Sequence, residues 1–167
     1  MFEPIQSDLL RAARGLVGLS QAEFAQAAGI DRRTLIRLES DSAKKNASLD
    51  IRSRIHMALD ALGIEIFATG VRWKWPDSST KRHASVIRGA RLLVGISQAE
   101  LSQKSGLDRQ SIVRMESGRL ARVDLDKEAA LIDTFIKLGV VLHFGTAQRA
   151  SEVRRQTPEV CGDQQRP

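Results

Sequence analysis

The chain has 167 residues, a formal net charge of +6 and an isoelectric point of about 10.1. Its single cysteine, Cys161, excludes an internal disulfide framework and a cysteine-based zinc site. No apolar run reaches the ~18 residues of a membrane-spanning helix. The basic balance favours a polyanionic partner such as nucleic acid.

Helices are predicted from the start of the chain, and the first two have clear boundaries. Ser7 or Asp8 can cap the first helix, and apolar residues at helical spacing continue until Gly18. Ser20 and Glu23 have the spacing of a capping box, which opens a second helix. The two helices are therefore expected to follow one another almost directly.

A very tight turn is predicted between the second and third helices. Gly29 suits the left-handed backbone that such a turn needs, and Asp31 is a good N-cap for the helix that follows. A fourth helix is expected over residues 48–61. Alternating apolar residues then predict two short strands, at 64–67 and 71–75.

The stretch from Leu19 to Asp41 occurs again from Ile96 to Gly118, at a constant shift of 77 residues. Nearly half of the aligned positions are identical, and most others exchange like for like. The shift exceeds the roughly 20 to 50 residues of solenoid repeats, so a whole domain is duplicated. We expect a first domain over 1–75, a linker over 76–83, a second domain over 84–146 and a disordered polar tail over 147–167.

The second copy repeats the order of elements of the first. A helix is expected from about Ala84 to Val94, and Ser97 and Glu100 form the next capping box. Gly106 makes the turn, and Asp108 caps the third helix of this copy. The last helix and strand are predicted over 124–138 and 140–144.

A short helix, a glycine turn and a second capped helix with exposed arginines follow the helix-turn-helix plan. Both copies resemble the Cro/C1-type (XRE-like) helix-turn-helix domain of phage repressors and related bacterial regulators. The shared pattern is S-Q-x-E-[FL]-x-Q-x-x-G-[IL]-D-R-x-[TS]-[LI]-[IV]-R-[LM]-E-S, and the resemblance covers 8–62 and 85–138. It implies a mainly α fold of two tandem lambda-repressor-like domains. Each would have four to five short helices, followed by a short strand or hairpin that pairs between the copies.

The resemblance also implies roles for individual residues. The third helix would lie in the major groove, where Arg forms a bidentate contact with guanine and Gln with adenine. The expected base-reading residues are Arg32, Arg33, Arg37, Arg109, Gln110 and Arg114. The expected contacts to the DNA backbone are Gln21, Thr34, Lys44, Lys45, Gln98, Ser111, Arg119 and Arg122. Structural ion pairs are expected between Arg14 and Glu39 and between Arg91 and Glu116.

Ile36 and Val113 are unusual in this pattern. They lie one turn after Arg32 and Arg109, where the family usually has a polar residue. Two interpretations are open. These side chains either touch a thymine methyl group or belong to a contact between subunits.

These features predict a sequence-specific double-stranded DNA-binding regulator of transcription, with repression as the expected role. It would read an imperfect palindrome, either as an intramolecular pseudo-dimer or as a homodimer. In the pseudo-dimer we expect the strands 64–67 and 140–144 to pair across the axis, since lone strands leave unpaired edges. The half-sites would differ at the base read by Arg33 or Gln110.

An alternative class is a protein-binding regulator. Such an antitoxin or antiactivator would use its helix-turn-helix domains to contact a toxin or an activator. Gly-rich phosphate loops, Ser/His/Asp sets and carboxylate pairs are absent from the sequence, so we expect no enzyme, cofactor or metal. The first residues lack a basic segment before an apolar core, which predicts a cytoplasmic protein of bacterial or phage type, nucleoid-associated when bound.

Overall fold

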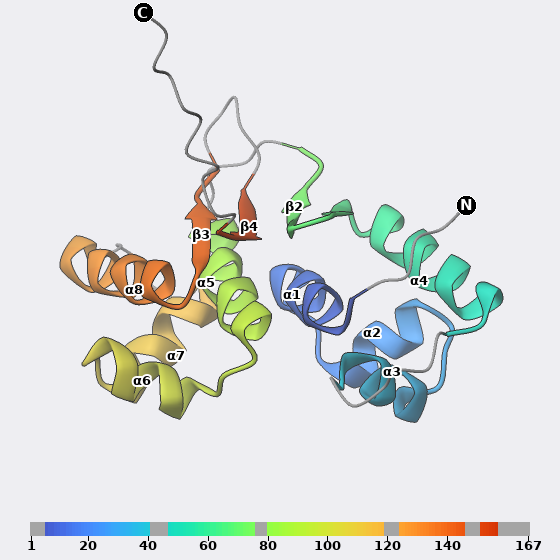
Figure 1. Cartoon of the computed structure of the whole chain (residues 1–167), viewed down its shortest axis with the longest axis horizontal. Coiled ribbons are helices and arrows are strands. Elements are labelled where there is room, and N and C mark those ends of the chain that lie inside the picture. Colours follow the sequence, from blue (N-terminus) through green and yellow to red (C-terminus); the bar gives the residue numbers. More distant parts are fainter. Residues whose placement is uncertain (1–5, 41–46, 76–79, 119–123, 146–150, 157–167) are drawn as a thin grey trace, which may run out of the picture.

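The computed structural model of the chain describes residues 6–40, 47–75, 80–118, 124–145 and 151–156. Each copy of the repeat forms four helices followed by a β-hairpin (Figure 1). The first copy contains α1 Ser7–Val17, α2 Gln21–Ala27, α3 Arg32–Glu39, α4 Leu49–Ala61, β1 Ile64–Phe67 and β2 Gly70–Trp73. The second contains α5 Thr80–Val94, α6 Gln98–Ser105, α7 Arg109–Ser117, α8 Leu125–Lys137, β3 Val140–His143 and β4 Glu152–Arg155. The mainly α fold with short strands after each helical part agrees with the sequence prediction.

Capping boxes determine where α2 and α6 begin. The Ser20 hydroxyl accepts a hydrogen bond from the Glu23 backbone N–H at 3.3 Å, and the Glu23 carboxylate accepts one from the Ser20 N–H at 2.7 Å. Ser97 and Glu100 repeat both bonds at 3.1 and 2.7 Å. Hydrogen bonds from these serines lower the pKa of both carboxyl groups. The boxes therefore satisfy N–H groups that a first helical turn would otherwise leave unpaired.

The two copies meet along α1 and α5, which pack side by side in the middle of the molecule (Figure 1). Two glycines make the close approach possible. A Cβ atom on Gly15 would lie 3.2 Å from the Gly89 Cα, and one on Gly89 would lie 3.2 Å from Leu16 Cδ1. Ala12 is fully buried beside them. Small residues at this crossing thus allow the helix backbones to come nearly into contact.

A four-stranded antiparallel sheet in the order β1-β2-β4-β3 joins the copies a second time. The β2–β4 register is Gly70↔Arg154, Val71↔Val153 and Arg72↔Glu152. Val71 and Val153 occupy equivalent places in their hairpins, opposite Ile66 and Leu142. Because these two equivalent residues face each other, a pseudo-two-fold axis passes between them. Both valines are fully buried, and β2 and β4 pack on α1 and α5.

The strand pairing differs from the one predicted. We expected residues 64–67 to pair directly with 140–144, and this was wrong, because β1 and β3 lie at the outer edges of the sheet. The expectation of a disordered tail over 147–167 was also wrong for Glu152–Arg155, which form β4. The strand has the sequence EVRR, which lacks an alternation of apolar residues, and only Val153 in it is buried. Hydrogen bonds to β2 on one side and β3 on the other hold it in place instead.

Two element boundaries also differ from the prediction. Helix α5 begins at Thr80, inside the expected linker 76–83, and β2 ends at Trp73 rather than at residue 75. Such shifts are common because the ends of an element depend on tertiary contacts more than its middle does.

Gly70 offers a test of the β2–β4 junction. A Cβ atom there would lie 2.3 Å from the Val153 carbonyl oxygen and 2.7 Å from the Arg154 Cα, both backbone atoms of the other copy. We expect Gly70→Ala to lower the free energy of unfolding by about 1–3 kcal/mol, measured by chemical denaturation. The matched control is Glu152→Ala at the equivalent position of β4, which we expect to cost less than about 1 kcal/mol. Equal losses would contradict the close inter-copy pairing at Gly70.

Candidate nucleic-acid interface

In the first copy, local hydrogen bonds close the turn between α2 and α3. Gly29 has a φ of 61°, in the left-handed region that glycine adopts without strain. Next to it, the Ile30 N–H donates to the Ala25 carbonyl at 3.0 Å. The Asp31 carboxylate then caps α3 by accepting from the Arg33 N–H at 2.7 Å. These bonds set the direction in which α3 leaves the turn.

The second copy also turns at a glycine with positive φ, but different hydrogen bonds close the turn and its cap is stronger. Gly106 has a φ of 71°, and its N–H donates to the Ser102 carbonyl at 3.0 Å. The Asp108 carboxylate accepts from the Ser111 hydroxyl at 2.6 Å and from the Ser111 N–H at 2.8 Å, which lowers the pKa of Asp108. Ser111 is buried, and its hydroxyl accepts from Lys127 Nζ at 3.2 Å. This inward placement does not fit the DNA-backbone contact expected for Ser111.

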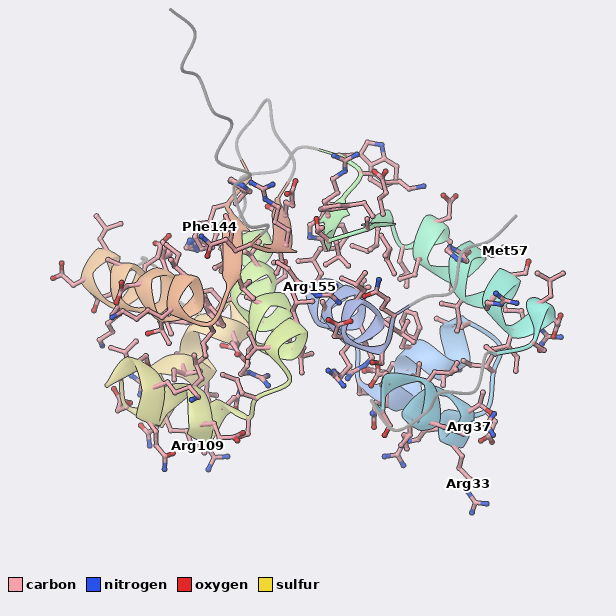
Figure 2. The ribbon with its side chains drawn as sticks, in the orientation of Figure 1. Arg33, Arg37, Met57, Arg109, Phe144 and Arg155 are labelled. Atoms are coloured by element: carbon pink, nitrogen blue, oxygen red, sulfur yellow. The ribbon has the colours of Figure 1, made fainter. Side chains whose placement is uncertain are left out.

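The third helix of each copy presents one buried and one exposed face. Leu35 in α3 and Ile112 in α7 are fully buried. The six expected base readers are all exposed, as are Ile36 and Val113 on the same helices: Arg32, Arg33, Arg37, Arg109, Gln110 and Arg114. Figure 2 shows Arg33, Arg37 and Arg109 on one edge of the molecule, opposite the sheet. The exposed, cationic faces of α3 and α7 therefore lie on the same side of the molecule.

A buried ion pair holds α3 against α1. Arg14 Nε and Nη2 donate to the two Glu39 carboxylate oxygens at 2.6 and 3.0 Å, and Arg14 Nη1 donates to the Leu19 carbonyl at 3.0 Å. The Arg14 and Glu39 side chains are only 12% and 3% exposed. The Gln21 amide donates to Glu39 Oε2 at 2.9 Å. We call this set of contacts the arginine clamp.

The second copy contains the same clamp between α5 and α7. Arg91 contacts the Glu116 carboxylate at 2.6 and 2.9 Å, and the Gln98 amide donates to it at 2.9 Å. The bidentate geometry fixes both the distance and the orientation of the two helices. Gln21 and Gln98, which we expected at phosphates, thus each have a protein partner in the clamp.

Sequence reasoning missed a further pair of arginines at the junction of the copies. Arg11 Nη1 donates to the Glu39 carbonyl at 2.6 Å, and its Nε donates to the Leu92 carbonyl of the other copy at 3.4 Å. Arg88 likewise donates to the Glu116 carbonyl. The guanidinium groups of Arg11 and Arg88 thus lie at the C-terminal ends of α3 and α7, where a cation neutralises the negative end of the helix dipole. The signal was available, because Arg11 recurs as Arg88 at the same shift of 77 residues.

The structure says little about the other residues that we expected to contact the DNA backbone. Thr34 is half-buried near the start of α3. Lys44, Lys45, Arg119 and Arg122 lie outside the residues that the structure describes. Their contact with phosphate therefore stays a prediction.

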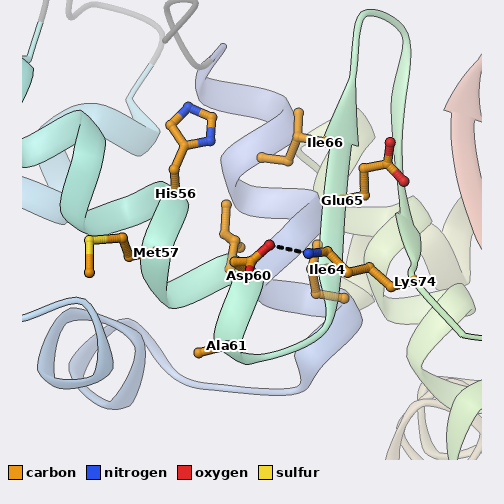
Figure 3. A pocket seen from close by; sticks show the side chains of 9 residues that line it. His56, Met57, Asp60, Ala61, Ile64, Glu65, Ile66 and Lys74 are labelled. Atoms are coloured by element: carbon orange, nitrogen blue, oxygen red, sulfur yellow. Dashed lines mark hydrogen bonds and ion pairs between the residues drawn. The ribbon is translucent and has the colours of Figure 1, made fainter.

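A separate hollow of about 600 Å³ lies between α4 and the β1–β2 hairpin (Figure 3). The Lys74 ammonium donates to the Asp60 carboxylate across it, so these polar groups satisfy each other. All residues that line the hollow fall within 56–74, so none of them belongs to α3. Among the described residues, no three His, Cys, Asp or Glu side chains gather closely enough to hold a metal ion.

Comparison with protein families agrees with this geometry. The family model described as helix-turn-helix matches the chain twice, over residues 10–65 and 87–127, which together make up more than half of its length. The chain belongs to the helix-turn-helix family. Its Cro/C1-type (XRE-like) members are DNA-binding regulators, and this helix-turn-helix protein is a DNA-binding regulator with two tandem domains. No curated protein and no solved structure matches the chain. Within the described ranges, no helix is long and apolar enough to cross a membrane.

The arginine clamp makes a stability prediction. Glu39→Gln removes the charge that Arg14 contacts and leaves a largely buried guanidinium without its counter-charge, so we expect the free energy of unfolding to fall by about 3–5 kcal/mol. Thermal and chemical denaturation would measure the loss. The control is Asp50→Asn in the exposed pair with Arg54, whose side chains are 68% and 51% exposed. That change should cost less than about 1 kcal/mol, and a similar loss in both variants would contradict the clamp's structural role.

Proposed function

We propose that this helix-turn-helix protein is a sequence-specific regulator of transcription that reads an imperfect palindrome as an intramolecular pseudo-dimer. The observation that carries the proposal is the pseudo-two-fold axis between Val71 and Val153. It relates two recognition helices whose cationic faces lie on one edge of the molecule (Figure 2). Single-domain regulators of this plan achieve the same arrangement by dimerising, with their recognition helices about 34 Å apart.

The chemistry of the exposed faces supports sequence reading. An arginine forms a bidentate contact with guanine O6 and N7, and a glutamine forms one with adenine N6 and N7. Arg32 and Arg37 of α3 recur as Arg109 and Arg114 of α7, whereas Arg33 is replaced by glutamine. The two half-sites would therefore be alike except at the base pair read by this position.

Repression is the regulatory role that requires the least beyond DNA binding. A chain that holds two half-sites one helical turn apart covers one side of the duplex over that length. Polymerase and the bound chain would then compete wherever the site overlaps a promoter. A reporter gene placed behind the selected site should lose expression when the chain is produced, and increased expression would argue for an activator.

Exchange of the one differing residue tests the reading model. Gln110→Arg gives α7 the same exposed residues as α3, so we expect site selection from random duplex DNA to yield a more symmetric palindrome. The base preferred at that position should change from adenine to guanine, with discrimination of about 1–3 kcal/mol.

Gln103→Arg is the matched control, because it adds the same charge to an exposed position of the neighbouring α6. It should change affinity for all sequences similarly and leave the selected site unchanged. Failure of the wild-type chain to select any sequence would argue against DNA reading and for the protein-binding alternative.

The pseudo-dimer also predicts a stoichiometry. Because α1–α5 packing and β2–β4 pairing lie within one chain, one chain should occupy both half-sites. Analytical ultracentrifugation of the complex with a labelled duplex would measure this, and we expect one chain per duplex. Two chains per duplex would contradict the proposal and support the homodimer.

A further inference from the structure

Two exposed aliphatic side chains lie among the arginines of the recognition helices. Ile36 in α3 is 40% exposed and Val113 in α7 is 42% exposed. They hold the same place in the two copies, at the shift of 77 residues that relates the recognition helices. An exposed apolar residue is common on any protein surface, but a repeated one in the middle of a cationic face needs a reason.

The helix places each aliphatic residue directly against the base readers. Residues three and four apart are neighbours on a helix surface, so Ile36 adjoins Arg33 and Arg32. In α7 the side chains of Arg109, Gln110, Val113 and Arg114 line one shallow groove. The aliphatic group and the hydrogen-bonding groups therefore share one exposed surface of the helix.

Contact between the copies does not account for this exposure. The copies meet through α1 and α5 and through β2 and β4. The recognition helices instead turn Leu35 and Ile112 towards their own domains. The contact between the two copies is thus provided by elements other than those that carry Ile36 and Val113.

We propose that Ile36 and Val113 read the methyl group of a thymine, one in each half-site; this inference rests on the proposed function. In the major groove the C5 methyl of thymine is the apolar group that distinguishes one base from the others. Isoleucine and valine are β-branched and have one strongly preferred side-chain rotamer in a helix. Their methyl groups therefore have defined positions beside the arginines. Each half-site contains a thymine next to the base pair read by Arg33 or Gln110.

The test removes the methyl group from the DNA and the aliphatic side chain from the protein. The probe is the duplex that the wild-type chain selects, with one thymine at a time replaced by deoxyuridine. Competition fluorescence anisotropy measures the change in affinity. At one thymine in each half-site we expect deoxyuridine to weaken binding about fourfold, the factor that corresponds to the burial of one methyl group.

Two protein variants assign each methyl group to its reader. With Ile36→Ala the deoxyuridine penalty should disappear in the half-site read by α3 and persist in the other. With Val113→Ala the pattern should be reversed. The control is Met57→Ala, which shortens a 67% exposed apolar side chain on α4 and should leave both penalties unchanged. Circular dichroism verifies that each variant is folded.

The outcomes separate this inference from the function on which it rests. If the wild-type chain selects a palindrome but deoxyuridine has no effect at any thymine, DNA reading stands and the methyl contact is overturned. A penalty that persists in both alanine variants overturns the assignment to Ile36 and Val113. If no sequence is selected, the proposed function itself fails.

Discussion

The close packing of α1 against α5 is the constraint on which the arrangement of this protein depends. Gly15 and Gly89 let the two helix backbones approach nearly to contact, and the buried core spans both copies around them. Dispersion and the burial of apolar surface at such a crossing fall steeply when an added methyl group separates the helices. Because α1 and α5 each belong to one helix-turn-helix domain, their crossing angle and distance determine how α3 and α7 are placed relative to each other.

The arginine clamp transmits this placement to the recognition helices. Glu39 and Glu116 lie at the C-terminal ends of α3 and α7, and their partners Arg14 and Arg91 lie on the central helix pair. A buried bidentate pair adds little net stability over an apolar contact, but it strongly penalises any geometry that separates the charges. Arg11 and Arg88 add hydrogen bonds to the last helical carbonyls from the same central pair. Each recognition helix is thereby held to the axis rather than only to its own domain.

The β2–β4 pair joins the two copies into one structure, so that they are more than two domains connected by a linker. Val71 and Val153 meet at the pseudo-axis, and each hairpin covers an edge strand of the other. An unpaired strand would expose backbone donors and acceptors that attract further chains. The β2–β4 pairing satisfies these groups on the facing edges of the two hairpins.

The sequence by itself determined the helices, the turns and the duplicated plan. Capping boxes, Gly29 and Asp31 act over three or four residues, so their effects can be deduced without knowledge of the fold. The Arg14–Glu39 and Arg91–Glu116 pairs were reached only through family resemblance, because they join residues far apart in the chain. The exposed faces of α3 and α7 followed from helical periodicity once the buried positions were identified, whereas their base-reading role is what the family resemblance implies.

Only the tertiary structure decided the sheet, the partners of Gln21 and Gln98, and the inward placement of Ser111. The strand Glu152–Arg155 has a single buried side chain, so hydrogen bonds to two neighbouring strands specify it and no local pattern does. The roles of Arg11 and Arg88 also depend on the fold, because each contacts the end of a helix that lies many residues later in the chain. Helix caps and turns depend on residues close together in the sequence. The pairing of strand edges and the partners of long polar side chains depend instead on which surfaces the complete fold brings together.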